Sequence, residues 1–511
     1  MAVIIRRVRR VGNGEGVLSD DKCRYDLVIR NGRLVTGLPD DSPTQRDLGI
    51  LGKRIRTIGR IRSPGRIEID ASGCLVTPGF IDIHSHTDES ALRNDCCSKL
   101  LQGVTTEVCG QCGGSVAPIS TDEARVERRR LRLQEAGWYP EMKWRTFSEF
   151  NGLVAGVGAP CNQCPCAGLW SIADDEYYRQ GGCEFSSMTA AVERALDDGV
   201  FGLSVHQGSR AWQRLELWQQ RKICSIVAEH GAVLSVHLSD YADGLLMALD
   251  RLLEAAAPSA GRLQMSHLKI LGKDKDSMIE RVLSRFETLQ GLLPVRYDAY
   301  PYSSICTRLK CFVEGTGISG NGSMRSGFYG DLADFALIRF LGSGRVLRRR
   351  ANEGWDQDVV AQLRTHGQGD LAGELVQAWG MRGQDTQRLL SSRLCSIGSD
   401  AIASRSKTTS GAYSPRRGRA TFPDAVGVMR RAGLTISAAV SHMTYASSVA
   451  MGIAERGLLA PGRYADVVVL DARNGEGQLR VRDVIVNGRV AVRNARVRDS
   501  HSGQALQRAV I

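Results

Sequence analysis

The 511-residue chain lacks any run of 18 or more apolar residues, the length that a membrane-spanning helix needs. Its first residues carry charges and lack the apolar stretch of a secretion signal. These two absences exclude a membrane span and a recognisable export signal. We therefore expect a soluble, cytoplasmic protein that has no membrane partner.

Aromatic residues are also scarce, at 6% of the chain, and none interrupts the arginine clusters. The formal net charge of +12 is concentrated in short runs such as 6–10, 125–132 and 345–350. Nucleic-acid-binding proteins combine such runs with a recognisable motif, which is missing here. The runs therefore indicate solvated helix faces and a basic leader, with an anionic substrate or partner as the alternative. We expect no nucleic-acid partner, and the sequence carries no signal for an oligomeric state.

Fourteen cysteines are spread from Cys23 to Cys395. Disulfide frameworks belong mainly to small secreted domains, so most of these side chains are expected to be reduced thiols. The run CNQCPC (161–166) contains half of a zinc knuckle without a second pair at suitable spacing, and we interpret it as loop thiols near a pocket. The run GTGISG (315–320) lacks the strand and helix that a dinucleotide site requires.

The two ends of the chain share one pattern. Residues 25–76 alternate apolar and polar side chains around tight turns, and residues 455–500 repeat this alternation with an Asn-Gly turn. Isolated hairpins are only marginally stable, so the two segments are expected to pair. The sequence predicts a small β-sandwich domain built from both chain termini, preceded by a basic N-terminal extension over 1–24.

Between them, residues 77–454 alternate short apolar runs with helical patterns. This alternation predicts an α/β fold, a metal-dependent (β/α)8 TIM barrel, in which the chemistry lies at the C-terminal ends of the strands. Residues 305–345 are glycine-rich and weakly periodic, and we interpret them as a lid-like excursion over the barrel mouth. The eight predicted strands cover 80–84, 103–109, 159–169, 200–205, 232–237, 262–267, 294–300 and 394–399.

Histidine placement follows these strands. The chain has only nine histidines, yet GFIDIHSHTD places His84 and His86 one residue apart at the end of the first strand. Alternate residues of a strand face the same side, so both rings can face the barrel interior ~6.6 Å apart along the chain. Two such imidazoles can bind one divalent metal, with Asp88 as a supporting partner.

Other predicted strands also end in residues that can bind metal or move protons: Cys112, His237, His267 and Asp400. Parallel barrel strands bring their C-terminal ends to one face, so these side chains are expected to meet. Imidazole and thiolate ligands favour zinc over ions that prefer oxygen. His206 ends the fourth strand and is either a core or supporting histidine or a substrate contact.

The motifs resemble the amidohydrolase superfamily and, within it, the N-acyl-D-amino-acid deacylases, or D-aminoacylases. The likeness is densest over 75–118, LVTPGFIDIHSHTDESALRNDCCSKLLQGVTTEVCGQCGGSVAP. It continues in SHLK, DAYPY, IGSD, ATFP and ERGLLAPGRYADVVVLD, and so reaches both ends of the chain.

The resemblance implies a zinc enzyme with one tight metal site. The alternative is a pair of metals, with the second site weaker than the first. His84 and His86 would bind one, often weakly held, metal. The thiolate of Cys112, either shared or at the tight zinc, would act with His237 and His267. The cysteine distinguishes this subfamily from cyclic amidases, which use a carboxylated lysine as the bridge.

The same resemblance implies hydrolysis of the linear amide of an N-acyl-D-amino acid, or a related N-acyl metabolite, to a carboxylate and a free amino acid. Zinc lowers the pKa of a bound water to about 7. Asp400 would accept the proton of that water and return it to the departing amine. Lys269, Tyr300 and Arg416 would bind the substrate carboxylate. For these three the alternative is a snorkelling or surface side chain.

Departures from the family pattern surround the substrate pocket. Cys306 stands where the family has a serine, Ser414 stands where a histidine precedes Pro-Arg, and GLSVHQGSRAW lacks the usual tyrosine. The sequence therefore indicates the type of reaction, hydrolysis, more firmly than it indicates the substrate. The alternatives are a cyclic-amide hydrolase of the dihydroorotase or hydantoinase type, a specialised amidase, and a non-catalytic relative.

Overall fold

The computed structural model describes most of the chain outside its N-terminal segment and several internal stretches. The predicted basic extension over 1–24, the GTGISG run and Ser414 lie outside the described residues. Among the described residues, no helix is both long and apolar enough to cross a membrane. The described residues are 25–119, 123, 126–127, 143–173, 184–272, 277–308, 335–341, 343–348, 375–404, 416–473, 475 and 479–508.

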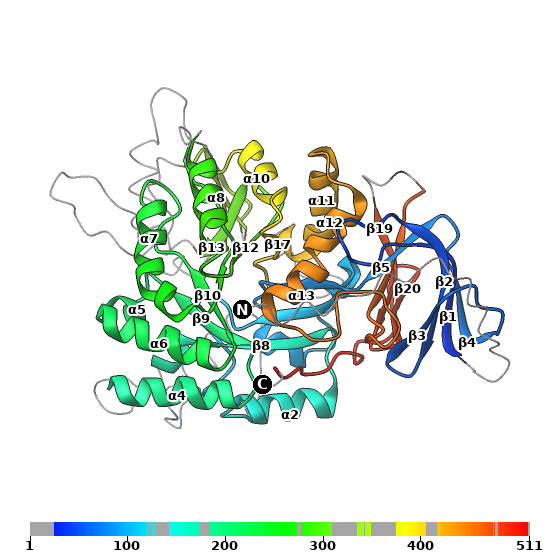
Figure 1. Ribbon diagram of the computed structural model, residues 1–511, viewed down its shortest axis with the longest axis horizontal. Helices are drawn as coiled ribbons and strands as arrows, with labels where there is room; N and C mark the ends of the chain where they lie inside the picture. Colours follow the sequence, from blue (N-terminus) through cyan, green and yellow to red (C-terminus); the bar gives the residue numbers. More distant parts are fainter. Residues whose placement is uncertain are drawn as a thin grey trace.

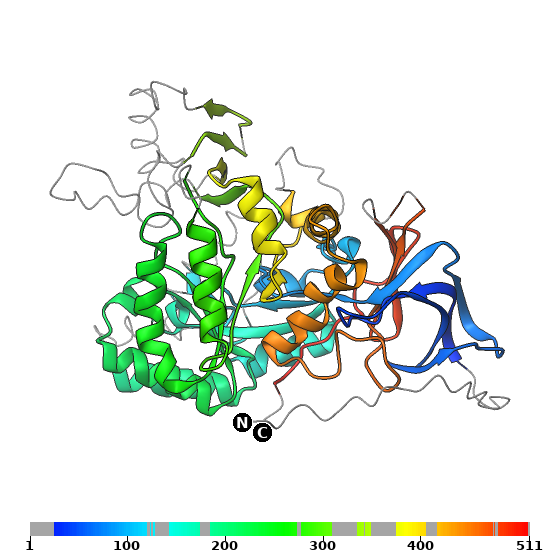
Figure 2. The same ribbon diagram turned by 45° about the horizontal axis from the view of Figure 1, so that its top comes forward.

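Eight parallel strands form a barrel, which confirms the predicted fold class (Figures 1 and 2). The first and last strands meet where the Ile83 N–H donates to the Ile397 carbonyl and Ser85 bridges Ala401. All eight predicted strands are present with shifted ends. In sheet order they are β17 (Cys395–Ile397), β12 (Val295–Ala299), β11 (Arg262–Met265), β10 (Val233–His237), β9 (Gly202–His206), β8 (Asn162–Gly168), β7 (Val104–Cys109) and β6 (Phe80–Asp82).

Strand β8 corrects one expectation. The cysteines of CNQCPC are not loop thiols: Cys161 immediately precedes β8, Cys164 and Cys166 lie in it, and all three are buried. Strands of a parallel barrel are buried on both faces, so small apolar side chains such as cysteine suit this position. Burial raises the pKa of all three thiols, so they behave as core residues.

Amphipathic helices surround the barrel (Figure 1). In α8 (Met278–Leu289) the buried side chains Met278, Val282 and Phe286 recur every four residues and so share one face. The same three-to-four-residue spacing recurs in the other outer helices, which pack their apolar faces on the strands. They include α2 (Phe147–Val157), α4 (Phe185–Asp197), α6 (Leu217–Glu229), α7 (Leu245–Ala256), α10 (Gly383–Leu390), α11 (Arg417–Arg431), α12 (Ile436–His442) and α13 (Tyr445–Met451).

Both chain ends build one nine-stranded mixed sheet beside the barrel, as the alternating patterns predicted (Figure 1). The two halves join where β5 pairs antiparallel with β18. Strand β1 pairs in parallel with β4 and β5, so the sheet is mixed and is not built from antiparallel hairpins alone. The domain boundaries at 76/77 and 454/455 stay predictions. The strands are β1 (Tyr25–Leu34), β2 (Thr44–Leu51), β3 (Arg54–Gly59), β4 (Gly65–Asp70), β5 (Cys74–Pro78), β18 (Val467–Asp471), β19 (Arg480–Val486), β20 (Arg489–Arg493) and β21 (Arg496–Val497).

A small antiparallel sheet occupies part of the predicted excursion over 305–345 (Figure 2). Its strand order is β13 (Ser304–Arg308), β16 (Leu375–Trp379), β14 (Leu337–Phe340) and β15 (Val346–Arg348). Strand β16 lies beyond the predicted range, and it is the strand that joins β13 to β14. The excursion therefore includes regular structure that the weak periodicity did not reveal.

The C-terminal segment runs along the end of the barrel where the strands begin, away from the small antiparallel sheet (Figure 1). Gly503 and Ala159 exchange two backbone hydrogen bonds of 2.7 and 3.2 Å. The Arg508 guanidinium donates to the carbonyls of Leu196 and Val200, each at 3.1 Å. These contacts tie residues 503–508 to the segment before β8, to the end of α4 and to the turn before β9.

Candidate metal centre

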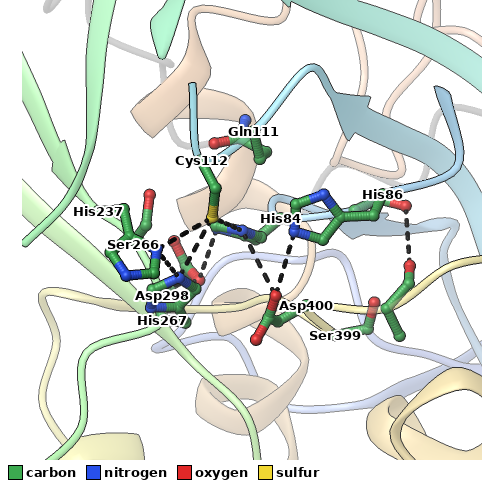
Figure 3. A network of polar contacts seen from close by, with 12 residues as sticks. His84, His86, Gln111, Cys112, His237, Ser266, His267, Asp298, Ser399 and Asp400 are labelled. Carbon is green, nitrogen blue, oxygen red and sulfur yellow. Dashed lines mark hydrogen bonds and ion pairs between the residues drawn. The ribbon is translucent and has the colours of Figure 1, made fainter. Parts of the chain in front are cut away.

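Cys112 lies at the centre of a cluster of imidazoles at the C-terminal ends of the barrel strands (Figure 3). Its Sγ atom is 3.4 Å from His84 Nε2, 3.3 Å from His267 Nε2 and 3.3 Å from His237 Nδ1. The His237 and His267 nitrogens are 2.9 Å apart. Residues from four separate strand ends therefore present their ligand atoms to one small volume.

Asp400 and His86 extend this cluster on the side of His84 (Figure 3). The Asp400 Oδ1 atom is 3.2 Å from His86 Nε2 and 3.8 Å from His84 Nε2. Ligand atoms of the six residues form three overlapping groups, each within 4.8 Å. The structure thus brings together all six side chains singled out at the strand ends, while their roles as ligands and catalyst stay predictions.

Three of these residues have left-handed backbone conformations, which are rare outside glycine. The φ angles are +55° at Cys112, +36° at His267 and +49° at Asp400. Such residues cost about 1–3 kcal/mol each and persist only where the surroundings enforce them. The Asp400 N–H donates to the His84 carbonyl at 2.8 Å, and the His267 N–H donates to Asp298 Oδ1 at 2.8 Å. The backbone is therefore held in conformations that turn these side chains toward one another.

Lys99, which no sequence motif singles out, holds the segment around Asp400. Its buried Nζ donates to Asp82 Oδ2 and Ser399 Oγ, both at 2.6 Å, and to the Ala401 carbonyl at 3.0 Å. Both chain neighbours of Asp400 are thereby tied to β6. A lysine pattern in the sequence could not reveal this, because the partners lie 17 to about 300 positions away.

The electrostatic environment favours anionic Cys112 and Asp400. Burial would raise the pKa of the Cys112 thiol, but the imidazoles of His267 and His84 outweigh burial and hold that pKa well below its usual value. Burial likewise opposes ionisation of Asp400, but the Arg417 guanidinium together with the imidazoles of His267, His86 and His84 outweighs burial, so the pKa of Asp400 is also well below its usual value. A thiolate and a carboxylate are the forms that bind metals and accept protons.

The donor set and its spacing fit zinc. Tetrahedral zinc with bonds of about 2.0–2.1 Å to nitrogen and about 2.3 Å to sulfur places its ligand atoms roughly 3.3–3.6 Å apart. The sulfur–nitrogen distances of 3.3 and 3.4 Å agree with this spacing, and the nitrogen pair at 2.9 Å is slightly closer. Cys112, His237 and His267 form the most compact of the three groups.

Lys269 and Tyr300, which were predicted to bind substrate, both lie beside this cluster. Lys269 is buried, and its Nζ is 5.7 Å from the centre of the Tyr300 ring. Burial lowers the pKa of Lys269 to about 8. Burial raises the pKa of Tyr300, so its hydroxyl stays protonated and can donate a hydrogen bond.

Arg416 does not join the site. Its exposed guanidinium is bound by Asp424 through two contacts of 2.6 Å. Arg417 takes the expected place, donating to Asp400 Oδ2 and to the Cys306 carbonyl, both at 2.8 Å. Successive residues of a helix point about 100° apart, so the start of α11 decides which of the two arginines faces the barrel. The resemblance pointed to Arg416, whereas the structure places the neighbouring Arg417 against Asp400.

Asp88 also differs from the expectation. Its Oδ1 accepts a hydrogen bond of 2.8 Å from the Gly110 N–H, so it holds the loop that leads to Cys112. The carboxylate beside Nδ1 of His84 is that of Asp298, whose Oδ1 lies 3.4 Å away. Asp298 belongs to the DAYPY motif at the end of β12, and its position after an apolar run was the available signal.

His206 lies in the site and packs against His237, which favours its interpretation as a supporting histidine. Its ring stacks on His237 with 4.1 Å between centroids and 15° between planes. The Gly208 N–H donates to His206 Nδ1 at 3.1 Å. Burial lowers the pKa of His206 to about 4, so the ring is neutral and supports His237 by packing.

Comparison with known proteins agrees with this geometry. The family model for the amidohydrolase family matches residues 68–146. A D-aminoacylase from Alcaligenes xylosoxydans xylosoxydans is 27% identical over 96% of this chain and 99% of that enzyme. A solved D-aminoacylase with a binuclear metal centre superposes with a TM-score of 0.76 at 24% identity, covering 95% of this chain and all of that one.

A second solved structure has the same fold. It is an N-acyl-D-glutamate deacylase from Bordetella bronchiseptica in complex with zinc and a phosphonate that mimics the tetrahedral intermediate. Its TM-score is also 0.76, at 24% identity and with 95% of this chain covered. The chain therefore resembles the amidohydrolase family and is a D-aminoacylase-like hydrolase of carbon–nitrogen bonds.

Proposed function

We propose that the protein is a zinc-dependent deacylase that hydrolyses the linear amide of an N-acyl-D-amino acid. The observation that carries this proposal is the cluster of one thiol and four imidazoles beside Asp400. Two buried or half-buried cations, Lys269 and Arg417, lie within the same site. A metal-binding centre next to cations suits a substrate that has both an amide and a carboxylate.

Cys112, His237 and His267 would hold the tight zinc, because they form the most compact group of ligand atoms. His84 and His86 would hold a second, more weakly bound metal on the side of Asp400. Zinc bound here would polarise the acyl oxygen and lower the pKa of a water to about 7. This supplies a nucleophile that free water at neutral pH does not provide.

Asp400 would carry the proton. Its Oδ2 is held by Arg417 at 2.8 Å, so Oδ1 is the oxygen that faces His84 and His86. Oδ1 would accept the proton of the attacking water and deliver it to the nitrogen of the breaking amide bond. The amine then leaves as a neutral molecule. Without this proton the departing amine would be a poor leaving group.

Substrate orientation would depend on Lys269, Arg417 and Tyr300. An ammonium and a planar guanidinium can together bind one carboxylate, and a phenol can donate a further hydrogen bond. The Arg417 guanidinium also lies over the Tyr300 ring, with 5.8 Å to its centroid. Holding the carboxylate at this edge of the cluster would leave the amide next to Asp400.

A substrate panel tests the proposal. Zinc-loaded and chelator-treated protein are incubated with matched N-acetyl-D- and N-acetyl-L-amino acids and with hydantoin, and amine release or ring opening is followed. We expect release from D substrates, loss on chelation and recovery with zinc. Turnover of cyclic amides alone would transfer the assignment to the hydantoinase type. Turnover that persists in full after complete zinc removal would contradict it.

A further inference from the structure

Tyr241 is a fully buried tyrosine four residues after the end of β10, and no sequence motif assigns it a functional role. Its hydroxyl oxygen is 3.1 Å from the Leu238 nitrogen, 3.2 Å from the Ser266 carbonyl oxygen and 3.1 Å from His267 Nδ1. The hydroxyl therefore lies behind His267, on the side of the ring away from Cys112.

The hydrogen positions follow from what each partner can do. The Leu238 N–H can only donate, and the Ser266 carbonyl can only accept. The tyrosine hydroxyl therefore accepts from Leu238 and gives its own proton to Ser266. Its second lone pair then accepts a proton from His267 Nδ1. A neutral imidazole protonated at Nδ1 has its lone pair at Nε2, the atom 3.3 Å from Cys112 Sγ.

The aromatic ring of Tyr241 faces Lys269, the lysine proposed to bind the substrate carboxylate. Lys269 Nζ lies 4.8 Å from the centroid of the Tyr241 ring, a distance typical of a cation–π contact. Lys269 follows His267 by two residues in the same loop. One tyrosine thus contacts both the proposed zinc ligand and the proposed carboxylate-binding residue, through chemically different groups.

We propose that Tyr241 is a positioning residue with two separable actions. Its hydroxyl fixes the tautomer and orientation of His267 as a zinc ligand, and its ring holds the Lys269 ammonium in place for the substrate carboxylate. The inference rests on the proposed zinc-dependent function. It assigns a role to a residue that touches neither the metal nor the reacting amide.

Tyr241→Phe separates the two actions, because it removes only the hydroxyl. Zinc affinity is measured by competition with a chromophoric chelator, on protein whose folding is checked by circular dichroism. Loss of a hydrogen-bond partner behind a metal-binding histidine typically weakens binding 10- to 100-fold, and we expect a loss in this range. With zinc in excess, the KM for an N-acyl-D-amino acid should stay within about twofold, because the ring remains.

Tyr297→Phe is the matched control. Tyr297 is equally buried, and its hydroxyl donates to the Leu389 carbonyl at 2.8 Å, between the barrel and its outer helices. Both variants lose one buried tyrosine hydroxyl, so both should lower the melting temperature. Only Tyr241→Phe should weaken zinc binding. Equal zinc affinities in the two variants would overturn the role of the hydroxyl.

Tyr241→Leu removes the ring as well. At saturating zinc it should raise KM at least fivefold above that of Tyr241→Phe, because Lys269 loses its aromatic contact. An unchanged KM would overturn the role of the ring. Failure of the proposed function is distinguishable, since the unsubstituted protein would then fail to bind zinc tightly or to release amine from any N-acyl-D-amino acid.

Discussion

The two ends of the barrel differ in what their residues do. At the C-terminal end, Cys112, His267 and Asp400 adopt left-handed backbone conformations and crowd polar groups together. At the N-terminal end, Gly503 pairs with Ala159, and the Arg508 guanidinium donates to backbone carbonyls. One end holds strained and mutually dependent groups, whereas the other forms ordinary hydrogen bonds.

This difference indicates that activity and stability depend on different parts of the molecule. Changes among the strained residues should alter metal binding or rate with small effects on unfolding. Changes at the opposite end should alter unfolding and leave the rate unchanged. The following experiments test this separation.

Asp400→Asn should have the largest effect. The amide cannot accept the proton of the attacking water, so kcat should fall by about 10³-fold, within the range typical of general-base catalysis. Tight zinc should remain bound, because the compact group of Cys112, His237 and His267 is intact. Steady-state kinetics and zinc content per chain check this. Loss of the tight zinc together with the rate would show that Asp400 acts mainly as a ligand.

Replacing the two adjacent arginines tests which of them faces the substrate. Arg417→Met should raise KM about 10- to 100-fold, because a charged hydrogen-bond donor near the cluster is lost. Arg416→Met should leave KM within about twofold, because Arg416 is exposed and bound to Asp424. The reverse pattern would restore the assignment made from the motif alone.

Arg508→Met should act at the other end of the barrel. It leaves the buried carbonyls of Leu196 and Val200 without their charged donor and should lower the free energy of unfolding by about 2–3 kcal/mol. The kcat of the zinc-loaded protein should not change. Urea unfolding followed by circular dichroism measures the first quantity. A large fall in kcat with unchanged stability would break the proposed separation of the two ends.

Replacing His442 should produce the smallest effect, which is a change in how the free energy of unfolding depends on pH. Its Nδ1 lies 2.8 Å from the carbonyl of Cys395, the first residue of β17, and burial lowers its pKa to about 4. The ordinary pKa of histidine is about 6.5, so between these values the unfolded chain binds more protons than the folded one. The free energy of unfolding should therefore fall as the pH drops through this window.

His442→Gln should remove that contribution. Between pH 7 and 4.5 the unsubstituted metal-free protein should lose about 2 kcal/mol more stability than the variant. Parallel unfolding curves at each pH give the difference. Identical pH dependence in the two proteins would contradict a neutral, buried His442.

Much of the architecture could be predicted because the signals are local. The barrel strands appear as short apolar runs, and parallel strands necessarily bring their ends to one face. That rule alone gathered Cys112, His237 and Asp400, although nearly 290 positions separate the first from the last. The pairing of the two chain ends followed from their shared alternation.

The remaining features depend on tertiary contacts or on helix phase. The choice of Arg417 over Arg416 depends on where α11 begins, and neighbouring arginines look alike in a sequence. Lys99 and Tyr241 act through partners that no local pattern identifies. The sheet that contains β13 and β16 pairs strands about 70 residues apart, beyond the reach of periodicity.

X-ray absorption at the zinc edge tests the central account most directly. Protein reconstituted with one equivalent of zinc should show one sulfur ligand at about 2.3 Å and nitrogen or oxygen ligands at about 2.0–2.1 Å. The sulfur contribution should disappear in Cys112→Ser. A zinc shell of oxygen and nitrogen alone in the unsubstituted protein, or a sulfur signal that persists in Cys112→Ser, would contradict a centre built around Cys112.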